Sequence, residues 1–126
     1  MAMRILVVED DLLNRMFFHD VLEGHGYEVA VVSDGGAVME EARAFRPDLV
    51  TMDIHLPNVS GLRLIRMMRR DAQLRDTPIL AVTAFAGRGE EDRIRKAGAD
   101  AYLSKPVTIE RLLGEVEKLS RANTAA

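Results

Sequence analysis

Short runs of apolar, mostly β-branched residues alternate along the chain with longer segments in which apolar residues recur every three or four positions. Such runs predict β-strands, and the longer segments predict amphipathic helices with one apolar face each. The predicted strands cover residues 4–8, 28–32, 49–52, 79–82 and 101–103. Strands and helices are therefore expected to alternate from the first strand to the last helix.

The predicted helices carry apolar residues at a spacing that matches the helical repeat. The residues expected to face a sheet are Leu13, Phe17 and Val21 in the first helix, Val38, Ala42 and Phe45 in the second, and Ile109, Leu112, Leu113 and Val116 in the last. Residues that interrupt regular structure lie at the borders of these elements, namely Gly24, Gly26, Pro47, Pro57, Gly61 and Gly98. The periodicity and the breakers thus place the same boundaries.

This alternation predicts the fold class. A strand, a helix and a further strand form a right-handed crossover, and repeated crossovers build a parallel sheet with helices on both faces. We therefore predict a doubly wound, flavodoxin-like α/β domain with a five-stranded parallel sheet. Domains of this class bind ligands beyond the carboxyl ends of their strands.

Length and composition fit a single domain with one hydrophobic core. The chain has 126 residues, of which 48% are hydrophobic, and this size is typical of one domain. We expect residues 1–121 to form that domain and residues 122–126 to form a short polar tail, with no effector domain attached. No signal peptide and no apolar stretch of about 20 residues is present, which favours a cytoplasmic protein without a membrane partner.

Charge and cysteine content exclude several kinds of function. The chain has 17 basic and 20 acidic residues, a net charge of -3, which argues against nucleic acid as a partner and in favour of proteins. It has no cysteine, so disulfides, thiolate metal sites and a cysteine nucleophile are excluded. The arginines Arg63, Arg66, Arg69 and Arg70 and the charged run over residues 89–96 are interpreted as solvated helix faces.

Polar residues with chemical potential lie at or just past the predicted strand ends. Glu9 and Asp10 follow the first strand, and Asp53 follows the third. Thr83 follows the fourth strand, and Lys105 lies just past the fifth. Because the carboxyl ends of parallel strands meet at one edge of the sheet, we expect these five residues to form one site.

The residue types at this edge suit phosphoryl transfer to a carboxylate. Asp53 is the candidate nucleophile, and its attack on phosphorus would form an acyl phosphate. Glu9, Asp10, Asp53 and one backbone carbonyl would supply the oxygen ligands that Mg²⁺ prefers. The ammonium of Lys105 and the hydroxyl of Thr83 would contact oxygens of the transferred group.

Each residue alone also has an ordinary structural interpretation. Asp10 could cap the first helix, Lys105 could be a surface lysine, and Thr83 could simply end a strand. The bond between Lys105 and Pro106 could be cis, which would fix how the lysine points, or an ordinary trans bond before the last helix. Only the joint placement of these residues at strand ends is specific.

Four motifs resemble those of the receiver domain of bacterial two-component response regulators. They are residues 7–11 (VVEDD), 52–57 (MDIHLP) with Gly61, 82–84 (VTA) and 102–106 (YLSKP). The resemblance implies that Asp53 takes a phosphoryl group from a phosphohistidine of a histidine kinase or histidine phosphotransfer protein, which docks near the first helix. It also implies Mg²⁺ held by Glu9, Asp10, Asp53 and the main-chain carbonyl of His55, with a cis bond between Lys105 and Pro106.

The resemblance further implies a conformational switch. Thr83 would move toward the phosphoryl group and Tyr102 would follow, so that the surface of the fourth helix, fifth strand and fifth helix binds a downstream protein. His55 and Phe85 occupy positions that tune phosphoryl lifetime in this family. Within the family, residues 18–23, 26–28 and 82–86 look like the DivK-like stand-alone receivers of cell-cycle phosphorelays.

The main expectation is thus a phosphoacceptor signalling protein rather than an enzyme, monomeric or pairing upon phosphorylation. One alternative is a receiver-like scaffold that binds partners independently of phosphate. A less favoured one is a Mg²⁺-dependent aspartyl phosphatase, since such enzymes share the nucleophile and metal. They usually need a second acid two residues after the nucleophile, and residue 55 is a histidine.

Overall fold

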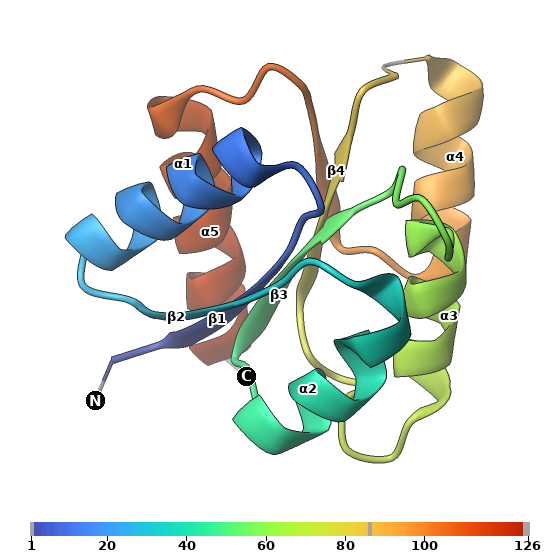
Figure 1. The fold of residues 1–126 in the computed structure, drawn as a ribbon, viewed down its shortest axis with the longest axis horizontal. Helices are drawn as coiled ribbons and strands as arrows, with labels where there is room; N and C mark the ends of the chain where they lie inside the picture. Colours follow the sequence, from blue (N-terminus) through green and yellow to red (C-terminus); the bar gives the residue numbers. More distant parts are fainter. Residues whose placement is uncertain (1, 86, 125–126) are drawn as a thin grey trace.

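The computed structural model describes residues 2–85 and 87–124, which form one parallel sheet between two layers of helices (Figure 1). The strands are β1 (Arg4–Val8), β2 (Glu28–Val32), β3 (Leu49–Asp53), β4 (Ile79–Thr83) and β5 (Ala101–Ser104), in the spatial order β2-β1-β3-β4-β5. The helices are α1 (Leu12–Gly24), α2 (Val38–Phe45), which follows the short 3₁₀ turn η1 (Gly35–Ala37), α3 (Gly61–Arg70), α4 (Arg88–Ala97) and α5 (Ile109–Thr124). The predicted five-stranded parallel sheet is confirmed.

The alternation of side chains along the strands divides the core into two parts. Leu6 of β1 and Met52 of β3 belong to the cluster that packs against α2, α3 and α4. Ile5 and Leu49, one pleat away, belong to the cluster that packs against α1 and α5. The central strand β3 is buried throughout its length, as expected for a parallel strand covered on both faces. No helix of the described ranges 2–85 and 87–124 is long and apolar enough to cross a bilayer.

Three strands extend one residue beyond their predicted ends. Asp53 and Thr83 are the last residues of β3 and β4, and Ser104 ends β5. The sheet pairing includes them, since Asp53 lies opposite Val82 and Thr83 lies opposite Ser104. Backbone hydrogen bonds between the strands continue past the apolar run, and the pattern of apolar side chains does not predict this extension. The two functional candidates therefore sit on the sheet itself rather than on loops.

The prediction for the inner face of α1 was partly wrong. Phe18 and Leu22 are the buried residues of this helix, whereas Leu13 is 75% exposed. Phe17 and Val21 pack at the edge of the same cluster and are partly buried. Apolar residues occupy so much of the circumference of α1 that their spacing alone fits more than one inward face. The helix consequently presents apolar side chains to solvent.

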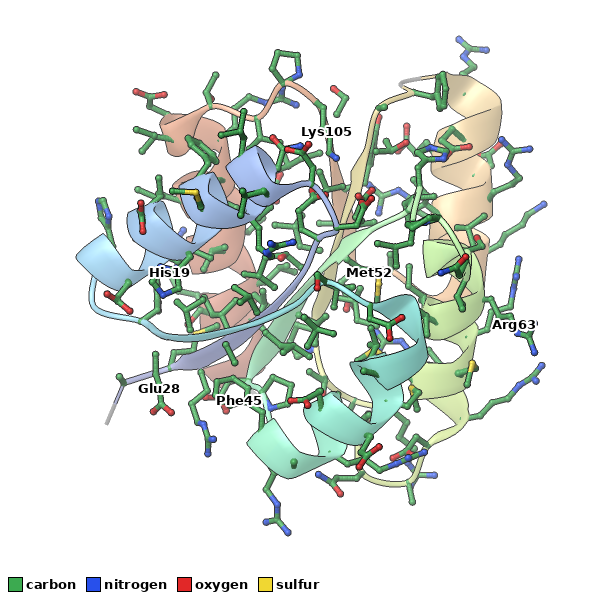
Figure 2. All side chains as sticks on the ribbon, viewed as in Figure 1. His19, Glu28, Phe45, Met52, Arg63 and Lys105 are labelled. Atoms are coloured by element: carbon green, nitrogen blue, oxygen red, sulfur yellow. The ribbon has the colours of Figure 1, made fainter. Side chains whose placement is uncertain are left out.

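The prediction that the four arginines of α3 lie on a solvated helix face is wrong for Arg69. Arg63 points away from the molecule (Figure 2). Arg69 is partly buried, and its guanidinium donates hydrogen bonds to the carbonyl oxygens of Gly98 (2.8 Å) and Thr77 (2.7 Å) and to the carboxylate of Asp100 (2.8 Å). It thereby ties the end of α3 to the residues before β4 and after α4. The other three arginines of this helix, Arg63, Arg66 and Arg70, are exposed, as predicted.

Gly61 allows α3 to begin against the end of β3. A β-carbon at this position would lie 2.3 Å from the carbonyl oxygen of Asp53 and 2.7 Å from the α-carbon of Ile54. Both are backbone atoms that cannot rotate away. The Gly61 N–H also donates to the Ile54 carbonyl oxygen at 3.0 Å. The position therefore admits only glycine for reasons of space.

We expect Gly61→Ala to lower the free energy of unfolding by about 1–3 kcal/mol or more, because the added methyl group overpacks rigid backbone. Gly114→Ala is the matched control, since a β-carbon there meets no atom within 4 Å and lies in α5. That control should raise the free energy of unfolding by about 0.5–1 kcal/mol. Urea unfolding of both variants measures the difference, and equal values for the two would contradict the steric argument.

Candidate functional site

Asp53 occupies the carboxyl end of the central strand, where β1, β4 and β5 also end (Figure 1). Its side chain is only 3% exposed. One carboxylate oxygen, Oδ1, accepts the backbone N–H of His55 at 3.0 Å. The other, Oδ2, lies 3.5 Å from the ammonium nitrogen of Lys105. Asp53 is thus a buried carboxylate held in place on both sides.

Glu9 and Asp10 bring two further carboxylates to this position from the turn after β1. Each of Glu9, Asp10 and Asp53 offers an oxygen within 4.8 Å of the others, an arrangement that could hold a metal ion. Glu9 is buried and Asp10 is exposed, so the cluster opens to solvent on one side. The three acids predicted to share a site are therefore together.

Asp10 does not cap α1, so the structural alternative for this residue is wrong. The cap is Asp11, whose side chain accepts the backbone N–H of Asn14 at 2.9 Å. Arg15, one turn into the helix, donates to the backbone carbonyl oxygens of Glu9 (3.4 Å) and Asp10 (3.1 Å). These contacts fix the backbone of the acidic turn and leave the Asp10 carboxylate at the mouth of the site.

Lys105 reaches the cluster from the residue after β5. Its ammonium nitrogen lies 3.1 Å from Glu9 Oε1, in addition to its contact with Asp53. The backbone N–H of Lys105 donates to the Thr83 carbonyl oxygen at 2.8 Å, and the bond to Pro106 is cis. Figure 2 labels Lys105 at this edge of the sheet. The lysine predicted from the sequence therefore joins the three acids.

The crowding of charges shifts the pKa values of two of these groups. Burial, together with the neighbouring Asp53 carboxylate, raises the pKa of Glu9 to about 7. Burial alone would lower the pKa of the Lys105 ammonium, but the Asp53 and Glu9 carboxylates hold it above its ordinary value. Without another cation, Glu9 therefore resists ionisation near neutral pH. A divalent ion would remove this penalty.

Thr83 adjoins the cluster, but its hydroxyl is engaged elsewhere. The oxygen accepts the backbone N–H of Phe85 at 3.1 Å and lies 3.1 Å from His55 Nε2. The hydroxyl donates to Glu90 Oε1 at 3.3 Å. The ring of His55 packs edge-on against that of Phe85, with centroids 4.8 Å apart. The predicted threonine is thus part of a polar network beside Asp53.

Glu90 is the residue of this network that the sequence interpretation missed. The run over residues 89–96 was interpreted as an exposed helix face, but Glu90 is only 7% exposed. It lies four residues before Ile94 and seven before Ala97, which are also buried, so the three share the inward stripe of α4. Burial works to raise the pKa of this carboxyl, yet hydrogen bonds from Arg93 and Thr83 hold it below its ordinary value.

Tyr102 lies on β5 and is partly buried, as expected for an amphipathic residue near a surface. Its hydroxyl donates to Glu91 Oε1 at 3.1 Å, which raises the pKa of the phenol. The tyrosine is therefore attached to the first turn of α4. Its movement with Thr83, implied by the family resemblance, stays a prediction.

Two named relatives are similar to this chain over nearly its whole length. The polar-differentiation response regulator DivK of Brucella anthropi is 43% identical over 117 residues, which cover 93% of this chain and 95% of that protein. The DivK of Brucella ovis is 42% identical over the same shares of both chains. The resemblance to DivK-like receivers is therefore confirmed.

Solved structures agree in fold. The chemotaxis response regulator CheY4 of Vibrio cholerae superposes with a TM-score of 0.90 at 27% identity and covers 94% of this chain and 99% of its own. The receiver domain of a sensor histidine kinase from Pseudomonas aeruginosa has a TM-score of 0.86 at 32% identity, covering 94% of this chain and 98% of its own. That structure holds a magnesium ion coordinated in its active site cleft.

The sequence profile of the response regulator receiver domain matches residues 5–117 of the chain. This range contains β2 to β5, all of β1 except Arg4, the carboxylate cluster and Lys105. Receivers act in two-component signalling with histidine kinases or phosphotransfer proteins and with downstream targets. Sequence, fold and site agree, and the chain belongs to the response regulator receiver family, with DivK-like relatives that place it in phosphorelay signalling.

Proposed function

We propose that Asp53 is the phosphoacceptor of a single-domain response regulator and that the donor is a phosphohistidine of a histidine kinase or phosphotransfer protein. The observation that carries this proposal is the position of Asp53, a buried carboxylate between two acids and the Lys105 ammonium. An Asp53 oxygen attacks phosphorus, the phosphorus–nitrogen bond of the donor breaks, and the imidazole leaves with the electron pair. The product is an acyl phosphate on Asp53.

The remaining residues act by position and charge. Lys105 neutralises negative charge on the transferred group, and its raised pKa keeps it an ammonium at neutral pH. The Thr83 hydroxyl would donate to a phosphoryl oxygen after it gives up its hydrogen bond to Glu90. The protein would thereby promote only its own phosphorylation and dephosphorylation.

The residues at the carboxyl edge of the sheet are suited to bind Mg²⁺. Three carboxylates offer hard oxygen ligands, and the raised pKa of Glu9 marks a site that a divalent cation would stabilise. Glu9, Asp10, Asp53 and the main-chain carbonyl of His55 would hold the ion. When bound, it would supply neutralising charge to the oxygens of the phosphoryl group.

The exposed apolar side of α1 supports donor docking at this helix. Leu12, Leu13 and Met16 are 58%, 75% and 51% exposed, and the first two lie directly after the acidic turn. An apolar surface beside the phosphoacceptor suits the helical surface of a donor protein. The downstream protein would bind at α4, β5 and α5 after phosphorylation.

The wider proposal follows from the family. The receiver expected over residues 1–121 includes the whole range of the family match, residues 5–117. The receiver would work in the cytoplasm, as a monomer or a phosphorylation-dependent pair, without nucleic acid or membrane. The names of the DivK relatives, which refer to polar differentiation, favour a role in cell-cycle signalling.

With Mg²⁺ and acetyl phosphate, wild type should gain the mass of one phosphoryl group, while Asp53→Asn should gain none, because an amide is not a nucleophile here. Intact-mass spectrometry measures both. Asp20→Asn, which changes an exposed acid on α1, is the control and should behave as wild type. A normal gain in Asp53→Asn would overturn the proposal, no gain in any protein would favour a phosphate-independent scaffold, and turnover of phosphomonoesters would favour a phosphatase.

Mg²⁺ affinity should rise with pH up to about 7 and level off above it, because Glu9 with a pKa of about 7 must lose its proton before it ligates the ion. Below that pH the affinity should fall by up to about tenfold per pH unit. Calorimetric titrations at several pH values, in two buffers of different protonation enthalpy, measure the affinity and the protons released. Glu9→Gln should bind more weakly with a flatter pH profile, and a flat wild-type profile would exclude this role of Glu9.

Leu13→Lys should slow phosphorylation by a phosphorylated histidine phosphotransfer protein by about tenfold or more, because an apolar side chain that the docked donor would bury is replaced by a charge. The rate with acetyl phosphate should stay unchanged, since a small donor needs no docking surface. Phosphorylation time courses with both donors provide the comparison. Equal slowing with both would mean that the variant damages the site rather than docking.

A further inference from the structure

The Thr83 hydroxyl uses its donor proton and both of its acceptor lone pairs in hydrogen bonds. A hydroxyl has one proton to donate and two lone pairs that accept. The backbone N–H of Phe85 uses one lone pair, at 3.1 Å, and Glu90 Oε1 takes the proton, at 3.3 Å. His55 Nε2, at 3.1 Å, then acts as a donor to the second lone pair. Thr83 has no proton left for any other acceptor.

Glu90 is held so that it can compete for that proton. Its carboxylate is buried, with Oε2 accepting a hydrogen bond from Arg93 and Oε1 lying 3.4 Å from His55 Nε2. The N-cap of α4, Gly87, makes no side-chain capping bond, and Glu90 in the first turn points inward to Thr83 instead. A buried carboxylate acceptor is strong because no water replaces it.

We propose that Glu90 is a positioning residue that competes with the phosphoryl group on Asp53 for the single proton of Thr83, and so stabilises the unphosphorylated arrangement of α4. The inference rests on the proposed function of Asp53. Donation to the phosphoryl group breaks the bond from Thr83 to Glu90. Among the residues that the structure describes, the side-chain partners left to Glu90 are Arg93, from its own helix, and the neighbouring His55. The first turn of α4 thereby loses its direct tie to β4.

The test is the affinity for beryllofluoride in the presence of Mg²⁺, measured by calorimetry, since this phosphoryl mimic needs the same Thr83 proton. Glu90→Ala should bind it about tenfold more tightly than wild type, as expected when a competing charge-assisted hydrogen bond is removed. Asp92→Ala removes a neighbouring exposed acid of α4 and should leave the affinity unchanged. Glu90→Gln keeps the shape of the side chain but is a weaker acceptor, so its gain should be smaller and of the same sign.

The same substitution in a Thr83→Ala background separates competition from a general structural effect. Without the threonine proton, Glu90→Ala should give no gain over Thr83→Ala alone. An equal gain in both backgrounds, or an unchanged or weaker affinity in Glu90→Ala and Glu90→Gln with Thr83 present, would overturn the inference while leaving the phosphoacceptor role intact. A wild-type protein that bound no beryllofluoride would instead count against the proposed function, and the inference would fall with it.

Discussion

The site depends on like charges, the carboxylates of Glu9, Asp10 and Asp53, that the fold holds close together. The turn after β1 and the end of β3 bring three carboxylates within 4.8 Å, and the sheet buries two of them. Cations offset Coulomb repulsion in such a place, and Lys105 supplies one within 3.5 Å of both Glu9 and Asp53. A proton on Glu9, whose pKa is raised to about 7, or a metal ion among the three carboxylates would supply further compensation. The same closeness that costs free energy in the fold therefore suits the cluster to a divalent cation.

Much of the fold and the site could be predicted because the relevant signals are periodic or local. Apolar runs predicted every strand. Each predicted site residue lies at or just past the end of a strand, and the order of the strands in the sheet brings Glu9, Asp53 and Lys105 together. The last residues of three strands were missed because backbone pairing extends beyond the apolar side chains. The inner face of α1 was misassigned because apolar residues cover too much of that helix to mark one side.

What the sequence did not reveal is how polar side chains choose partners across the fold. Glu90 looks like one acid in a charged run, and only its packing beside Thr83 and His55 makes it part of the site. Its place on the stripe of Ile94 and Ala97 was a signal that periodicity could have supplied. Arg69 gave no such signal, because three of its four acceptors are the backbone carbonyl oxygens of Arg75, Thr77 and Gly98. Any residue type has a backbone carbonyl oxygen, so hydrogen bonds to the backbone cannot be predicted from the residue types of the partners.

The hydrogen bonds of Arg69 also hold the carboxyl end of α4. They hold Gly98, the C-cap residue that directly follows α4, and a β-carbon at Gly98 would lie 2.7 Å from the Arg69 side chain, so the two fit closely. The opposite end of the helix is attached through Glu90 and Glu91 to side chains of β4 and β5. One end of α4 is thus attached to the Arg69 side chain through a backbone carbonyl oxygen, and the other end to the side chains of Thr83 and Tyr102, so a change in the partners of Glu90 or Glu91 acts on the first turn and leaves the attachment at Gly98 in place.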